Sequence, residues 1–407
     1  MANNNENKVL NVPHLRFPEF TDEWKESVLS DFVERVKRKN KNNLCKLPLT
    51  ISAQYGLVDQ ISFFNKVIAS ENMSNYYLLH KGDFAYNKSY SSEYPWGAIK
   101  RLDCYEQGTL SSLYICFKPY SHVSSDFLTH YFETSKWHHG ISEIAVEGAR
   151  NHGLLNVGIQ DFFETRHCLP QSLLEQEKIA KFLNLIEERI ATQNKIIEKY
   201  ESLIQAIIYQ KKTDGMRVKS WQKTELSKVL QERNEKNIDG YVVCSVSVSQ
   251  GVVNQIKYLG RSFAAKETTH YNVVKYGDII YTKSPTGDFP YGIVKRSCIK
   301  KSVAVSPLYG VYKPICDSIG VILHFYFMQP SNAFNYLHPL IQKGAKNTIN
   351  ITNERFLKNS IPLPKAENEA IYIANTLISI QKKIDMEKKM LRSYEKEKQY
   401  LLSKMFI

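Results

Sequence analysis

"YPWGAIKR", residues 94–101, is written a second time in this chain as "FPYGIVKR", residues 289–296. Both stretches read aromatic, proline, aromatic, glycine, two apolar residues, lysine and arginine. Longer stretches align at nearly the same separation: "SVLSDFVERVKRKN" (27–40) with "TELSKVLQERNEKN" (224–237), "LHKGDFAYNKS" (79–89) with "VKYGDIIYTKS" (274–284), and "GARNHGLLNVGIQDFFETRHCLP" (148–170) with "GAKNTINITNERFLKNSIPLP" (344–364). The separation drifts from 197 to 194 residues, as small loop insertions produce. The sequence is therefore a tandem duplication of two diverged copies.

Each copy ends in a stretch with the apolar spacing of a coiled coil. Apolar residues alternate at spacings of four and three without an intervening proline or glycine, which predicts a long helix with one apolar seam. The first predicted seam contains Ile179, Leu183, Ile186, Ile190, Gln193, Ile197, Tyr200, Ile204 and Ile207. The second contains Ile373, Leu377, Ile380, Ile384, Glu387, Leu391, Tyr394, Lys398 and Leu401. A polar residue stands at the same seam position in both, which is a known way of fixing register, so we expect the two helices to pair. The alternative is that each helix packs only on its own domain.

About 150 residues of mixed character precede each helix. "YVVCSVSVSQGVVNQIKYL" (241–259) alternates like strand, turn and strand, and 127–141 and 320–337 have the apolar spacing of a short helix. We therefore expect an α+β fold with a curved, mostly antiparallel sheet in each copy. The predicted boundaries are a first domain at 1–170, a long helix at 171–212, a second domain at 213–364 and a second long helix at 365–407.

Composition places the chain among globular proteins. It has 407 residues, of which 43% are hydrophobic and 23% charged, and no apolar run approaches the ~20 residues that span a bilayer. The first residues lack the pattern of a signal peptide. The seven cysteines form no C-x-x-C pair, which argues against a disulfide framework and a structural zinc site. We expect a cytoplasmic protein with reduced thiols.

The formal net charge of +13 is uneven along the chain. Residues 1–212 contain 25 Lys/Arg and 25 Asp/Glu, whereas residues 213–407 contain 29 and 16. A basic balance favours a polyanionic partner such as nucleic acid, with a solubilising surface as the alternative. The first predicted domain, 1–170, is itself almost neutral, with 18 basic and 19 acidic residues.

Several stretches resemble the specificity (S) subunits of type I restriction-modification enzymes, the HsdS family. They are "VPHLRFPEFTDEW" (12–24), "LPQSLLEQEKIAKFLNLIEERI" (169–190) and "IPLPKAENEAIYIANTLISIQKKI" (361–384). The family signature, I-P-L-P-P-L-x-E-Q before a helix, is matched in the first copy by Leu169, Pro170, Leu174, Glu175 and Gln176. The second copy keeps "IPLP" but has Asn368 and Glu369 where Glu and Gln are expected.

The resemblance implies that each domain is a target recognition domain that reads one half of a split site on double-stranded DNA. It implies that the helices pair antiparallel and set the distance between the readers. A helix of ~38 residues is ~57 Å long, on the scale of half-sites one DNA turn apart. Because the copies have diverged, we expect an asymmetric site. The family also implies two methyltransferase subunits that use S-adenosylmethionine and two endonuclease subunits that use ATP and magnesium, with no cofactor bound by this chain.

DNA contacts need basic side chains for phosphates and hydrogen-bonding side chains for base edges. The candidates in the first copy are Lys37, Arg38, Lys39, Lys41, Lys88, Ser89, Lys100, Arg101, Arg150 and Asn151. Those in the second copy are Lys283, Ser284, Lys295, Arg296, Lys300, Lys301, Lys343 and Lys346. The aromatic candidates for packing on sugars or a thymine methyl are Tyr90, Trp96 and Tyr291. The alternative is that the repeated motif only forms a turn, marked by Gly97 and Gly292. Base-reading residues are expected where the copies differ.

No catalytic motif emerges from the sequence. There is no Asn/Asp-Pro-Pro-Tyr/Phe motif, no GxxxxGK[ST] loop and no grouping with metal-ligand spacing, and Gly-Asp in "KGD" and "YGD" is first a turn signal. We therefore expect no catalysis by this chain alone. The rival hypotheses are a coiled-coil scaffold for protein assembly with only weak DNA binding, and a stand-alone enzyme with an unrecognised site.

Overall fold

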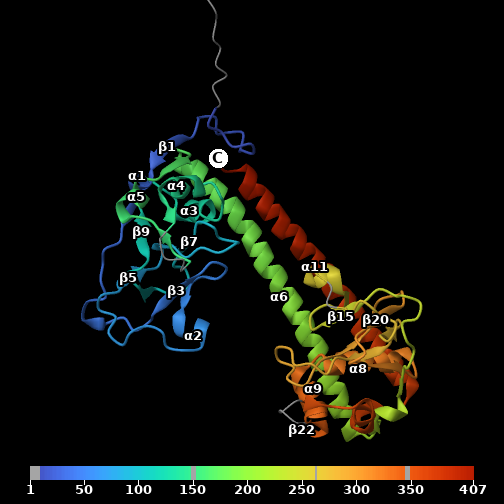
Figure 1. The fold of residues 1–407 in the computed structure, drawn as a ribbon. Helices are drawn as coiled ribbons and strands as arrows, with labels where there is room; N and C mark the ends of the chain where they lie inside the picture. The colour runs from blue at the N-terminus through green and yellow to red at the C-terminus, as the bar shows by residue number, and fades with distance from the viewer. Residues whose placement is uncertain (1–9, 148–152, 262–263, 344–348) are drawn as a thin grey trace, which may run out of the picture. The chain divides into compact units, whose positions relative to one another are not determined.

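The computed structural model describes residues 10–147, 153–261, 264–343 and 349–407 (Figure 1). The chain forms two compact units. Unit 1 comprises residues 1–192 together with 391–407, and unit 2 comprises residues 193–390.

Antiparallel strands make up the sheets of unit 1. A four-stranded sheet has the order β2-β9-β6-β7, and smaller pairs join β1 with β12, β3 with β4, β5 with β8, and β10 with β11. The bounds are β1 Lys25–Val28, β2 Val33–Arg35, β3 Leu49–Ser52, β4 Gly56–Asp59, β5 Tyr77–His80, β6 Phe84–Asn87, β7 Ala98–Arg101, β8 Gln107–Leu110, β9 Ile115–Pro119, β10 Val146–Glu147, β11 Leu155–Asn156 and β12 Arg166–Leu169.

Unit 2 repeats this topology pair by pair. Its four-stranded sheet has the order β14-β21-β18-β19, and β13 pairs with β24, β15 with β16, β17 with β20, and β22 with β23. The bounds are β13 Trp221–Glu225, β14 Leu230–Glu232, β15 Cys244–Ser247, β16 Gly251–Asn254, β17 Asn272–Val274, β18 Ile279–Tyr281, β19 Val294–Arg296, β20 Val303–Val305, β21 Gly310–Pro314, β22 Gln342–Lys343, β23 Ile349–Asn350 and β24 Ser360–Pro364. The duplication predicted from sequence is thus a duplication of structure.

Short helices complete both units. Each predicted helix at 127–141 and 320–337 is in fact two: α3 and α4 in unit 1, and α8 and α9 in unit 2. The short-helix bounds are α1 Leu29–Phe32, α2 Gln60–Phe64, α3 Ser125–Tyr131, α4 His138–Ile144, α5 Ile159–Phe163, α7 Gln255–Leu259, α8 Asp317–Phe327, α9 Pro330–Leu337 and α10 Asn353–Lys358, with 3₁₀ turns η1 Lys41–Asn43, η2 Leu226–Lys228 and η3 His338–Leu340.

Aromatic side chains from sheet and helix fill the two cores in parallel ways. In unit 1, the rings of Tyr86 on β6 and Phe162 on α5 stack at 4.9 Å between centroids. In unit 2, Tyr281 on β18 and Phe356 on α10 stack at 4.8 Å. These four side chains are almost completely buried, and apolar burial of this kind is the main favourable contribution to folding.

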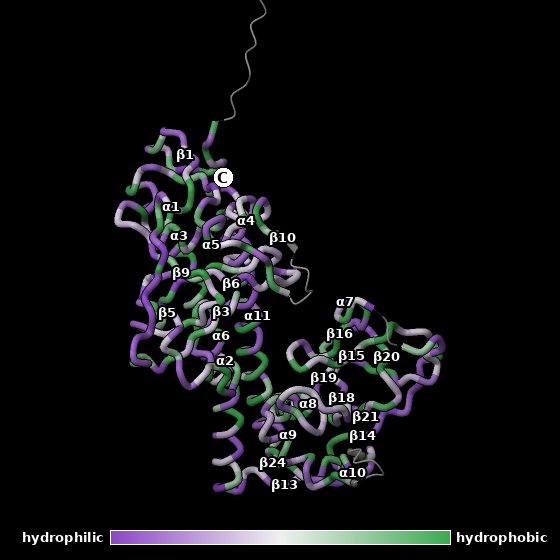
Figure 2. Tube along the Cα trace, turned by 60° about the vertical axis from the view of Figure 1, so that its left-hand side comes forward, coloured by the Kyte–Doolittle hydropathy of each residue, from purple (hydrophilic) through white to green (hydrophobic). Residues whose placement is uncertain are grey.

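The long helices are α6, Leu173–Arg217, and α11, Glu367–Lys404, and hydrophilic and hydrophobic residues alternate along α6 in Figure 2. Contacts within each unit show that they pair antiparallel, because higher residue numbers on α6 meet lower ones on α11. In unit 1, Lys398 forms an ion pair with Glu187 at 2.6 Å. In unit 2, the Lys211 ammonium lies 5.8 Å from the centroid of the Tyr372 ring. The predicted fold class, α+β domains with paired long helices, is confirmed.

Both long helices begin with the same tertiary contact. The indole Nε1 of Trp24 donates to Glu175 at 3.1 Å, and that of Trp221 donates to Glu369 at 2.7 Å. Glu369 therefore occupies the position of Glu175. The sequence alignment that places Asn368 at this position is wrong by one residue. Arg16 adds a bidentate ion pair to Glu175 in unit 1, at 2.7 and 2.8 Å.

The end of the chain belongs to the core of unit 1. Phe406 is fully buried, and its ring lies 5.3 Å from that of Phe127 and 6.4 Å from that of Trp24. The backbone N–H of Leu15 donates to the carbonyl of Lys404 at 2.9 Å. Residues 391–407 are thus an integral part of the first domain.

Candidate nucleic-acid interface

The repeated aromatic-Pro-aromatic-Gly motif is a turn locked onto the central sheet. The Tyr86 hydroxyl donates to the carbonyl of Trp96 at 2.9 Å, and the Tyr281 hydroxyl donates to that of Tyr291 at 2.7 Å. The next residue is a glycine with positive φ, +80° at Gly97 and +96° at Gly292, and a Cβ there would lie 2.2 Å from the Asn87 carbonyl oxygen or 2.9 Å from the Lys283 nitrogen. Only glycine fits, which explains why both copies keep it.

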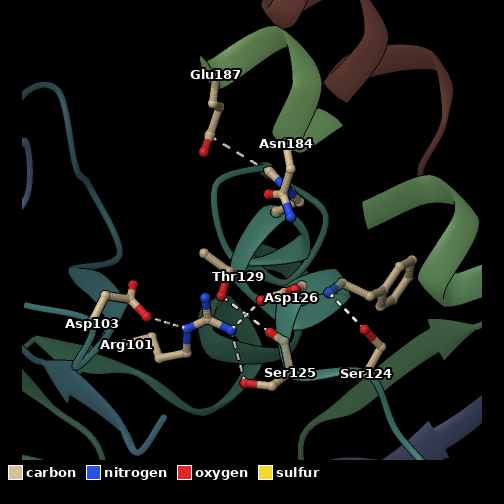
Figure 3. A network of polar contacts seen from close by, with 10 residues as sticks. Arg101, Asp103, Ser124, Ser125, Asp126, Thr129, Asn184 and Glu187 are labelled. Carbon is tan, nitrogen blue, oxygen red and sulfur yellow. Dashed lines mark hydrogen bonds and ion pairs between the residues drawn. The ribbon is translucent and has the colours of Figure 1, made fainter. Parts of the chain in front are cut away.

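The arginine that closes each motif anchors the following helix. Figure 3 shows the Arg101 guanidinium between Asp103 on one side and Asp126 and Ser125 of α3 on the other, at 2.6, 2.6 and 3.0 Å. Arg296 forms the equivalent ion pair with Asp317, the first residue of α8. A carboxylate in the first turn is also stabilised by the helix dipole.

The lysine before each arginine is ion-paired in the first copy and buried in the second. Lys100 forms an ion pair with Glu133. Lys295 is only 4% exposed beneath α8, and burial lowers its pKa to about 8. The structure therefore corrects the hypothesis that Lys295 and Arg296 lie on a DNA-binding surface, because covering β19 with α8 places both side chains in the interior.

The Gly-Asp turns are structural as well. Arg38 forms an ion pair with Asp83. Arg233, which aligns with Val36 in the first copy, forms a similar pair with the matching aspartate, Asp278, at N–O distances of 2.6 and 2.9 Å. Each aspartate also accepts a backbone N–H three residues earlier, at 2.7 Å in the first copy and 2.8 Å in the second. Burial raises the pKa of Asp83. Arg38 is thus held on its own domain. The turn predicted at Gly-Asp is present in both copies, with positive φ at Gly82 and Gly277.

Lys88 and Lys283 follow these turns, and both are half-buried. The Lys88 ammonium donates to the Val157 carbonyl at 2.8 Å, and burial lowers the pKa of both lysines. The adjoining Ser89, Tyr90 and Ser284 are exposed, whereas the ring of Tyr291 packs on Phe334 at 5.3 Å. Trp96 is partly buried against the core of unit 1.

Five predicted lysines are exposed: Lys37, Lys41, Lys39, Lys300 and Lys301. Within the described residues, none of them has an ion-pair partner. Lys39, between the first two, donates to the Asn75 carbonyl at 2.9 Å and lies 3.8 Å from the Tyr77 ring centroid. These lysines remain predicted phosphate contacts, and the fold leaves them exposed.

A hollow of about 490 Å³ on unit 1 gathers further cations that sequence reasoning missed. Arg35 and Lys118 line it together with Lys37 and Arg38. Lys118 on β9 lies opposite Glu34 in the register of β2 and forms an ion pair with it at 3.0 Å, which places Lys118 beside Arg35. The hollow thus holds four cations and one carboxylate, so a nearly neutral domain has a locally basic surface.

Some predicted positions have no described side chain. Arg150, Asn151 and Lys346 lie outside the described residues, and Lys343 lies in β22, whose side chains are not described.

No protein-family model matches the chain, and no curated protein matches it in sequence. Solved structures do match. The crystal structure of the type I restriction-modification S subunit from M. genitalium is 12% identical, with a TM-score of 0.57 over 97% of this chain and 99% of that chain. The chain has the fold of a type I restriction-modification S subunit.

Two further solved structures also cover nearly the whole chain, with lower TM-scores. The HsdS subunit from Thermoanaerobacter tengcongensis is 15% identical, with a TM-score of 0.43 over 97% of this chain and 98% of that one. A chain from a structure on complex assembly and conformational transition of the type I R-M system is 15% identical, with a TM-score of 0.47 over 94% and 97%.

Across the described ranges, no group of three or more His, Cys, Asp or Glu side chains is placed to hold a metal ion. None of the helices in those ranges combines the length and apolarity that a bilayer crossing requires.

Proposed function

We propose that this chain is the DNA-specificity subunit of a type I restriction-modification enzyme. Each domain reads one half of a split, asymmetric DNA site, and the chain is not catalytic by itself. The observation that carries the proposal is the fold shared with an S subunit over nearly the whole of both chains, together with its internal duplication.

The surface chemistry supports DNA as the ligand. Lys300 and Lys301 in the second domain and Lys37 and Lys41 in the first are exposed, and side chains of this kind neutralise phosphates. Several framework positions recur in both copies, among them Tyr86 and Tyr281, and Gly97 and Gly292, whereas Lys37 and Lys41 align with Asn234 and Ile238. Two domains built alike but differing at the surface suit two different half-sites.

The proposal includes partner subunits, because the sequence carries neither the Asn/Asp-Pro-Pro-Tyr/Phe motif nor a GxxxxGK[ST] loop. Two methyltransferase subunits, which use S-adenosylmethionine, and two endonuclease subunits, which use ATP and magnesium, would supply the chemistry. The paired helices α6 and α11 would hold the readers at a fixed separation and dock these subunits. The setting for such an enzyme is the cytoplasm.

Mapping methylated adenines in the host genome tests the proposal. With the gene intact we expect one split motif to be methylated at nearly all its occurrences, and without the gene that motif alone should lose methylation. An unchanged methylation pattern, together with intact assembly of partner proteins, would favour the scaffold with weak DNA binding.

A further inference from the structure

An apolar tip protrudes from the first domain where no described residue covers it. Strands β3 and β4 form a hairpin, and α2 follows directly with three exposed apolar side chains. Ile61 is 40% exposed, Phe63 44% and Phe64 43%. Exposed apolar residues that cluster, rather than scatter singly, mark interaction sites.

The second domain carries the same tip. The stretch "GLVDQISFFN" (56–65) aligns with "GVVNQIKYLG" (251–260), and β15, β16 and α7 reproduce the hairpin and helix. Ile256 is 58% exposed, Tyr258 44% and Leu259 44%. The two diverged copies have thus both kept three exposed apolar or aromatic side chains here, and the Tyr258 hydroxyl hydrogen-bonds to that of Ser247 at 3.0 Å.

Both tips are rigidly built despite their exposure. Asp59 accepts the N–H of Ile61 at 3.0 Å, and Asn254 accepts that of Lys257 at 3.0 Å, so each short helix is capped at its start. Each helix ends on a residue with positive φ, Asn65 at 50° and Gly260 at 72°. A small helix fixed at both ends presents its side chains in one orientation, at little entropic cost on binding.

The size and charge of the tips indicate DNA rather than a protein partner. A stable protein interface uses about 20–30 residues on each side, and a tip offers three apolar side chains, or six in the first domain with Tyr55, Val67 and Ile68. Lys66 is exposed two positions after the last residue of α2, and Arg261 stands at the matching position after α7. Proteins that deform DNA insert Phe, Leu or Ile side chains between base pairs and contact the adjacent backbone with cations.

We propose that the tips at α2 and α7 are wedges, each of which enters a DNA groove in its half-site and unstacks one base step. The proposal rests on the proposed function, since it assumes that each domain meets one half-site. The wedges would make binding depend on how easily the DNA sequence is deformed, because flexible pyrimidine–purine steps are the easiest to unstack.

The test uses this chain assembled with its methyltransferase subunits and a duplex carrying the mapped motif. 2-Aminopurine is placed at successive positions of each half-site, and its fluorescence rises when it is unstacked. We expect one bright step in each half-site. The double variant F63A/F64A should abolish the signal in the first half-site only, and Y258A/L259A in the second only. Affinity should fall about tenfold, as for loss of one stacked aromatic contact, with an unchanged salt slope because no charge is removed.

The control variants remove apolar side chains that are more exposed than those of the tips and lie outside them in sequence. Leu44 and Ile238 are each 80% exposed, so L44A and I238A should leave fluorescence and affinity unchanged. If the complex binds its motif normally but 2-aminopurine fluorescence rises at no position, the wedge proposal is wrong and the proposed function stands. Tip variants that bind DNA normally but fail to assemble with the methyltransferase also overturn it, and show a protein-docking surface. A complex that binds no duplex specifically overturns the proposed function, and the wedge with it.

Discussion

Gln193 donates from its side-chain amide to Glu387, its own counterpart 194 residues later in the duplication. The amide also reaches the Glu387 backbone carbonyl at 3.3 Å, and Gln193 is 5% exposed. In an antiparallel pair of repeated helices, only one level of the seam brings equivalent positions together. The polar pair marks that level and so specifies the register of α6 against α11.

Breaking this pair should cost stability, and replacing it should not. Q193L leaves the glutamate without its partner in the seam, so we expect the free energy of unfolding to fall by about 1–3 kcal/mol. Q193L/E387L should recover the loss, because two apolar residues need no partner there. Denaturant unfolding of the two single variants and the double variant measures the coupling. Strictly additive effects would show that the side chains do not interact.

Removing exposed lysines should weaken binding to every DNA sequence alike. For K300A/K301A we expect the salt dependence of binding to flatten by about two units of slope, since each phosphate contact contributes about one. Titrations of specific and random duplexes at several salt concentrations measure this. The control is K358A, which removes a lysine already paired with Glu354 on α10. An unchanged slope for the double variant would remove Lys300 and Lys301 from the interface.

Exchanging the second domain should change one half of the recognition site. Residues 213–364 replaced by the same region of a related subunit should yield a methylated motif with one new and one old half. Sequencing of methylated adenines reads the result directly. If both halves change together, each domain does not read its own half-site.

The buried Lys295 should make the stability of unit 2 depend on pH. Burial lowers its pKa from 10.5 in the unfolded chain to about 8. Between these values the unfolded state binds more protons than the folded state, so stability should rise with pH by up to ~1.4 kcal/mol per pH unit. Thermal unfolding from pH 7.5 to 9.5 should show this rise in the native protein and a flatter profile in K295M. Equal slopes would mean that Lys295 is charged in the folded state.

Lengthening the helix pair should lengthen the DNA spacer. One heptad inserted between Ile197 and Tyr200 keeps the seam in phase and adds ~10 Å, about three base pairs of B-DNA. We expect the same half-sites with a longer spacer, or no methylation if the second reader no longer meets its groove. An active enzyme with an unchanged spacer would show that the helices do not set the separation.

Sequence periodicity and internal repetition predicted the long helices and the duplicated domains well. The spacing from Ile179 to Ile204 predicts a helix, and α6 spans it. The mixed domains before each helix follow from alternating apolar residues and turn glycines. At "NQIKYL", however, the pattern predicts a strand where the structure has helix α7. Three apolar residues have a similar spacing in a short capped helix and in a strand.

The candidate site was harder to predict, because composition does not show what a charge faces. Arg38 and Asp83 are 45 residues apart in sequence, and so are Arg233 and Asp278. Nothing local to any of the four reveals the ion pair. The two aspartates match between the copies, but their arginine partners do not, because Arg38 aligns with Glu235 and Arg233 aligns with Val36. Lys295 was misplaced for a related reason, since only the packing of α8 on β19 decides that this face is interior.

The burial of Phe406 among Trp24 and Phe127 has a consequence for biosynthesis. Unit 2 is continuous in sequence, so all its residues leave the ribosome before the residues that complete unit 1. The first domain to be translated is therefore the last to close its core. Until then Trp24 and Phe127 lack their contacts with Phe406. A prematurely terminated chain would therefore expose these aromatic side chains to chaperones and proteases and would lack a complete first domain.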